Sequence, residues 1–240
     1  MGAVFSGRKT KCRLYELRLS ETYPSYYVAN VLLTNADEDL TNSSWKILMS
    51  GESTENFRAN REHPSFHYSS CLTWFYDIFF SRFFYLSPDV VPMFENVSMV
   101  HQGKLLATVI ASALNSLKKP VILRRKLIQL VSGHNGKGVK GVHYGNMGAA
   151  LFWSLEQVLG TKIFNDETKQ AWIRMYSFLL SIIIPPVVKF SLGKDYVAED
   201  VDENSSTRVL FTTVSGQNLR SAFSALSTST KSNTDVSALA

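Results

Sequence analysis

The sequence predicts an all-α domain of about six to eight helices, with an extension at each end. Apolar residues recur at helical spacing through the middle of the chain, and no segment shows the alternation that is typical of a strand. The fifteen Phe and ten Tyr residues are crowded between Phe66 and Phe84 and become sparse after Tyr196. The buried core is therefore expected in the middle of the chain.

Two changes in composition divide the chain. Residues 1–38 lack a sustained period and are predicted to be an N-terminal extension whose tyrosines and aliphatic residues pack on the domain. Residues 39–192 are predicted to form the domain, with its core at 71–190. Residues 193–240 begin acidic and become rich in Ser and Thr, a composition typical of a disordered tail.

The first helix of the domain is expected near residue 41. Thr41 and Asn42 precede an apolar stretch that contains Trp45, which predicts a short N-capped helix ending near Gly51. Residues 51–68 are polar and are expected to form a long loop.

The centre of the chain predicts two helices joined by a corner. Residues 71–85 are densely apolar and predict a helix, after which Pro88 begins a short corner that ends at residues 92–94. Residues 96–118 predict a buried amphipathic helix. Its apolar face is formed by Met99, Leu106, Ile110, Ala113 and Leu117.

Three further helices follow. Pro120 begins the first, and the glycines at 133, 136 and 138 end it near His134. Residues 143–159 carry apolar residues at helical spacing before Gly160, and residues 166–184 form a last long helix. The longest apolar run, of about twelve residues, is shorter than the roughly twenty that a membrane span needs, so we expect no spanning helix.

The amino terminus matches a lipidation signal. Gly2 follows Met1 and precedes Ser6 by four residues, the arrangement that myristoylation requires, and Cys12 lies where a palmitoyl chain can be added. One myristoyl chain anchors a protein only marginally, so a second signal is needed. Alternatively, Gly2 simply follows the initiator, Cys12 has no role and the nearby charges form a solvated surface.

The net charge of +5 is concentrated at the same end. Five basic residues occur in the first eighteen: Arg8, Lys9, Lys11, Arg13 and Arg18. Near anionic lipid each of the first four would contribute about 1 kcal/mol, and this distribution favours a membrane surface over nucleic acid. Cys12 and Cys71, the only cysteines, lie far apart without zinc-type spacing, so a reducing, cytoplasmic location is expected.

His134 is the candidate ligand for a metal cofactor. It lies at the end of an apolar helix, directly before a glycine-rich turn. A helix-end histidine is usually a surface or capping residue, but a haem also requires one neutral imidazole, an apolar slot and an opposing helix. The helix at 96–118 can supply that opposing wall.

Residues 71–190 resemble the globin family, and within it the globin domain of bacterial flavohaemoglobins. Residues 79–84, Pro88 and, six residues later, Phe94 are similar to the family's B helix, C turn and CD corner. Residues 102–107 are similar to its distal E helix, and Gln102 precedes His134 by 32 residues, as in this branch. The resemblance implies a globin fold, a 3-over-3 helical sandwich.

The resemblance also implies a haem b site. His134 would be the proximal iron ligand, Phe94 would stack on the haem, and Gln102 and Leu106 would be the distal polar and apolar residues. Val139 and Tyr144 match the family's F-to-G segment, with Tyr144 on the proximal side. A shift of one residue would instead place His101 in the distal position, as a sixth iron ligand; the spacing favours Gln102.

The sequence departs from flavohaemoglobins at three points. Phe80 occupies the B-helix position of a tyrosine that donates to bound O2, so Gln102 is the expected donor and O2 affinity is expected to be moderate. The proximal carboxylate would fall near Val187, where the chain has only apolar residues and prolines. No flavin or nicotinamide domain is expected after the globin, so redox turnover would require an external reductase.

These observations predict a haem-binding globin that reversibly binds O2, and NO or CO, at ferrous iron, as in oxygen transport. We expect it on the cytoplasmic face of a membrane through its N-terminal lipid. An alternative is a redox or sensor globin with NO dioxygenase, nitrite or peroxide chemistry, which a bis-histidyl haem would favour. A second alternative is an interaction protein of globin fold that has lost haem.

Overall fold

The computed structural model describes residues 2–50 and 54–193, with side chains from residue 12 onward. This part contains eight α-helices and one 3-10 helix and no strand, so the prediction of an all-α fold is confirmed. The predicted tail after residue 193 lies outside the described residues. The elements are α1 (Gly2–Thr22), α2 (Asn35–Met49), α3 (Glu55–Arg61), α4 (Cys71–Leu86), η1 (Pro88–Phe94), α5 (Met99–Ser116), α6 (Pro120–Asn135), α7 (Gly141–Leu159) and α8 (Asp166–Ser191).

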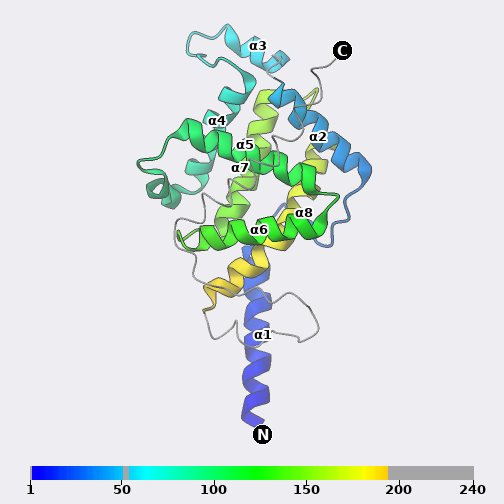
Figure 1. Ribbon diagram of the computed structural model, residues 1–240, viewed down its shortest axis with the longest axis vertical. Helices are drawn as coiled ribbons and strands as arrows, with labels where there is room; N and C mark the ends of the chain where they lie inside the picture. Colours follow the sequence, from blue (N-terminus) through cyan, green and yellow to red (C-terminus); the bar gives the residue numbers. More distant parts are fainter. Residues whose placement is uncertain (1, 51–53, 194–240) are drawn as a thin grey trace, which may run out of the picture.

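Helices α2 to α8 all contribute buried side chains to one apolar core. Helix α1 projects from the other helices (Figure 1). Helix α7 packs along α4, while α8 packs against α2, α6 and α7. Helix α5 contacts α2, α4 and α6. The centre of the core is formed by fully buried side chains from α2, α4, α7 and α8, among them Leu48, Phe75, Leu155 and Trp172.

The N-terminal boundary is placed differently from the prediction. Helix α2 begins after Thr34, so the expected division at residue 38 falls inside a helix. The backbone N–H of Asp37 donates to Thr34 Oγ1 at 3.1 Å, and the carboxylate of Asp37 accepts from the N–H of Thr34 at 3.0 Å. Asp37 also accepts a hydrogen bond from Arg174 Nε on α8 at 2.9 Å, which ties the start of α2 to the core.

Two segments expected to be irregular are helical. Residues 2–22 form α1, and residues 55–61, predicted as part of a loop, form α3. Thr54 caps α3: its hydroxyl accepts from the N–H of Phe57 at 3.0 Å and donates to Val158 O on α7 at 2.6 Å. This contact with α7, 104 residues away, fixes a helix too short to be stable alone.

Helix α8 extends seven residues beyond its predicted end at Ile184. Pro185 and Pro186 lie inside it, and the following Val187 and Val188 are buried. Packing of these valines offsets the backbone hydrogen bonds that the prolines remove. Among the described helices, α8 alone is long and apolar enough to cross a membrane, but 67% of its most apolar window is buried inside the domain, as in a core helix.

Candidate functional site

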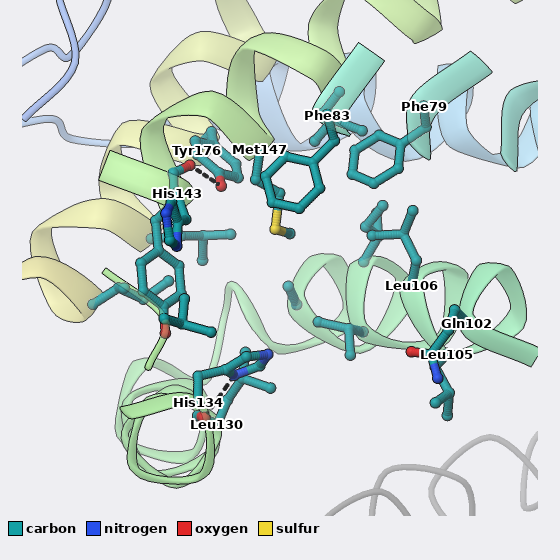
Figure 2. Close-up of a pocket in the computed structure, with 18 of the residues that line it drawn as sticks. Phe79, Phe83, Gln102, Leu105, Leu106, Leu130, His134, His143, Met147 and Tyr176 are labelled. Atoms are coloured by element: carbon teal, nitrogen blue, oxygen red, sulfur yellow. Dashed lines mark hydrogen bonds between the residues drawn. The ribbon is translucent and has the colours of Figure 1, made fainter. Parts of the chain in front are cut away.

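A single large cavity lies among α4, η1, α5, α6, α7 and α8 in the described part of the chain. Its volume is about 190 Å³, far above the ~10–15 Å³ that one water molecule needs. The lining is mostly aliphatic and aromatic, with a few polar side chains (Figure 2). Such an apolar cavity with few polar groups is the usual setting for a small ligand or cofactor.

His134 is the polar residue that α6 contributes to the cavity. Its Nδ1 lies 2.8 Å from the carbonyl oxygen of Leu130, one turn earlier, and a carbonyl can only accept, so Nδ1 carries the hydrogen. Nε2 is then the unprotonated nitrogen, and the ring points into the cavity (Figure 2). Burial lowers the pKa of His134 and outweighs the bond to Leu130, so the imidazole is neutral at pH 7.

A tight turn places the next cavity residue after α6. Gly138 has a φ of +82°, which favours glycine, and the N–H of Val139 donates back to His134 O at 3.2 Å. The side chain of Val139 thereby lines the cavity beside His134. The turn at Gly138 thus joins the end of α6 to the start of α7 at Gly141.

His143 links the cavity wall to η1. Its side chain is 2% exposed, and its Nδ1 accepts from the backbone N–H of Lys140 at 3.1 Å. Its Nε2 therefore carries the hydrogen and donates to Asp89 Oδ2 at 3.2 Å. Lys140 Nζ also lies 2.8 Å from that oxygen and is the main reason that the pKa of Asp89 is lowered.

Tyr144 presents a buried hydroxyl without a partner. The residue is 5% exposed and its ring lies edge-on to His134, with centroids 6.1 Å apart. Its Oη makes no hydrogen bond within the described part of the chain, although its carbonyl accepts from Tyr176 Oη at 2.8 Å. An unsatisfied hydroxyl of this kind is costly, and a polar group held in the cavity would satisfy it.

The opposite wall is formed by α4, η1 and α5. Phe80 and Leu106 are buried and line the cavity, and Phe94 packs edge-on against Phe80, with centroids 5.8 Å apart. Gln102 is the polar residue of this wall and faces the interior across from His134 (Figure 2). Its neighbour His101 is exposed and does not line the cavity.

The structure thus gathers seven of the predicted site residues around one cavity: Phe80, Phe94, Gln102, Leu106, His134, Val139 and Tyr144. The sequence analysis did not assign Leu105, His143 and Met147 to it. The spacing of His143, Tyr144, Met147 and Leu151 contained the signal, because residues three and four apart share one helix face.

The predicted lipidation residues lie on α1. Gly2 is its first residue, and the exposure of this residue lies outside what the structure describes. Cys12 is exposed. Figure 1 shows the N-terminal half of α1 projecting away from the other helices.

Comparison with protein families supports the same interpretation of the cavity. Residues 78–183 match the model of the globin family. This segment is a globin domain. It includes every cavity-lining residue named above, and globin domains are typical carriers of haem that binds diatomic gases.

Haem fits the groups that line the globin cavity. His134 offers an unprotonated nitrogen toward the interior, apolar walls stand on both sides, and Tyr144 supplies an orphaned buried hydroxyl. Neutral imidazole is the form of histidine that binds iron. The hydrogen bond from His134 to Leu130 also matches the outer contact that commonly orients a metal-binding histidine.

Proposed function

We propose that this protein binds haem b through His134 and reversibly binds O2, with NO and CO as further ligands. One observation carries the proposal. The Nδ1 of His134 is committed to Leu130 O, so Nε2 faces an apolar cavity whose far wall holds Gln102. Bound haem would supply a ferrous iron centre at which diatomic gases bind.

The residues of the chain would then set how the ligand is held. Gln102 is the donor on the α5 side, and its NH2 group can donate to a small polar ligand. One neutral hydrogen bond contributes about 0.5–1.5 kcal/mol, which supports moderate affinity. Phe80 and Leu106 are buried and would restrict water on that side. Phe80 stands where flavohaemoglobins, the branch that the sequence resembles, carry a tyrosine.

The test is the optical spectrum of the ferrous recombinant protein, beside His134→Ala and His101→Ala. We expect one broad deoxy band that sharpens with CO, is retained in His101→Ala and is lost in His134→Ala. Sharp split bands that disappear in His101→Ala would instead establish a six-coordinate redox or sensor globin with an external reductase. No haem band in the wild type would contradict the proposal.

We also propose that the N-terminus anchors the globin to the cytoplasmic face of a membrane through myristate on Gly2. The projection of α1 away from the domain supports it, as does the exposure of Cys12, a second acylation position. Expression with an alkyne analogue of myristate should label the wild type and leave Gly2→Ala unlabelled. The proposal would be contradicted if neither the wild type nor Gly2→Ala carried label and both were found in the membrane fraction to the same extent.

A further inference from the structure

Residues 22–28 lie along the outer side of α7, close to the cavity wall. Glycines make this approach possible: a Cβ at Gly141 would overlap Thr22 Cγ2, and one at Gly148 would overlap the Tyr26 hydroxyl. A Cβ at Gly145 would come within 3.2 Å of Pro24 Cβ. Thr22, Pro24 and Tyr26 thus each pack against a glycine of α7. We call residues 22–28 the strap.

Directional bonds hold the strap in place. Tyr26 Oη donates to Gly145 O at 2.7 Å, and the N–H of Val28 donates to Ser177 Oγ on α8 at 3.1 Å. Ser177 is fully buried, so its bond to the strap belongs to the core of the domain. The Tyr26 ring also packs edge-on against Phe152, with centroids 5.2 Å apart.

The adjacent face of the same α7 segment forms part of the cavity wall. His143, Tyr144 and Met147 line the cavity, each within two residues of a glycine that the strap touches. Tyr176 connects the two faces: it lines the cavity, donates to Tyr144 O at 2.8 Å, and lies 6.4 Å from the Tyr26 ring, centroid to centroid. A displacement of Tyr26 therefore acts on groups that also contact the cavity.

We propose that the strap is a positioning element that couples the placement of α1 to the cavity wall of α7. Helix α1 ends at Thr22, the residue against Gly141, so a change in the orientation of α1 begins at the strap. Coupling of this kind is reciprocal: what fills the cavity must also change the stability of the strap. Only this reciprocal part rests on the proposed haem binding.

The experiment is amide hydrogen exchange on the full chain, with and without added haem. Tyr26→Phe removes one hydroxyl and keeps the ring, while Gly145→Ala presses on Pro24 without altering a cavity residue. Tyr23→Phe is the matched control, because it also removes one tyrosine hydroxyl from the strap. Tyr23 interacts with Tyr27 inside the strap, and the two rings stack with centroids 3.9 Å apart. Loss of one hydrogen bond predicts exchange of residues 141–152 that is about two- to tenfold faster in Tyr26→Phe.

In the wild type, haem should slow exchange in residues 12–28 as well as around the cavity, and Tyr26→Phe should lose the effect on residues 12–28. The control should behave as the wild type. Unchanged exchange of residues 141–152 in both strap variants would overturn the proposal. If the wild type binds no haem, the proposed function fails, and the strap is still tested by the exchange of the haem-free variants.

Discussion

The two walls of the cavity differ in how their polar groups are held. On the α6–α7 wall, His134 is bonded to Leu130 O and His143 bridges Lys140 and Asp89, so each ring is fixed by the backbone or by another element. On the α4–α5 wall, aromatic and aliphatic side chains surround Gln102. A histidine that binds a metal is usually held in one orientation by a second hydrogen bond, whereas a small ligand that comes and goes needs only one donor beside open space. Under the proposed haem binding, the α6–α7 wall would hold the cofactor and the α4–α5 wall would hold its ligand.

The largest expected effect is that of pH on the α6–α7 wall. Because the folded pKa of His134 lies below its usual 6.5, its contribution to apoprotein stability is fully present above about pH 6.5 and is lost as pH falls toward the folded pKa. Below that pKa, protons compete with iron for Nε2, and haem affinity should fall about tenfold per pH unit. Haem titrations between pH 4 and 8 measure this.

A flat haem affinity across that range would show that Nε2 does not take part in binding. CO association in the haem-loaded protein serves as the control, because Gln102 carries no titrating group. The α4–α5 wall should therefore show no corresponding pH step. A step of equal size on both sides would remove the distinction between the two walls.

The next effect tests whether His143 fixes the same wall. His143→Leu removes the bonds to Lys140 N–H and Asp89, and at about 0.5–1.5 kcal/mol for each bond we expect the apoprotein to lose about 1–3 kcal/mol. Lys140→Ala is the matched control, because it keeps the backbone N–H that donates to His143 and removes only the amine that pairs with Asp89. Urea unfolding measures both, and equal losses would assign the effect to the surface charges instead.

Some of the contacts tested above could be predicted from the sequence, and others could not. Helix periods predicted the helices, since residues on a helix face repeat predictably, and the resemblance to globins predicted that Gln102 and His134 line one site. The bridge from His143 to Asp89 spans 54 residues, and the approach of Tyr26 to Gly145 spans 119. No local pattern encodes such pairings, which form only when the helices pack.

The N-terminal differences have two sources, one local and one tertiary. The cap at Thr34 was overlooked in favour of the apolar stretch near Trp45, and the strap residues have no period of their own. The sequence analysis assigned no role to the glycines at 141, 145 and 148, and the structure uses them for close approach. Composition identifies such glycines but not the segment that covers them.

A smaller effect is expected on the α4–α5 wall. Gln102→Leu removes the donor that faces His134, and the ligand dissociation rate should rise about two- to tenfold, as expected for one neutral hydrogen bond. Stopped-flow displacement of O2 by CO measures the rate. His101→Leu is the control on the adjacent position, and since His101 is exposed it should leave the rate unchanged. The reverse result would assign the distal role to His101.

The smallest effect concerns the hydroxyl of Tyr144. In the apoprotein this buried group has no partner among the described residues, so Tyr144→Phe should raise the free energy of unfolding by about 1 kcal/mol. Tyr176→Phe is the matched control, because its hydroxyl donates to Tyr144 O, and its loss should lower stability by a similar amount. When haem is bound, the gain in Tyr144→Phe should vanish if a polar group of the cofactor satisfies the hydroxyl. A gain that persists with haem would show that the α6–α7 wall carries an unsatisfied group in both states, and that Tyr144 shapes the wall by its ring alone.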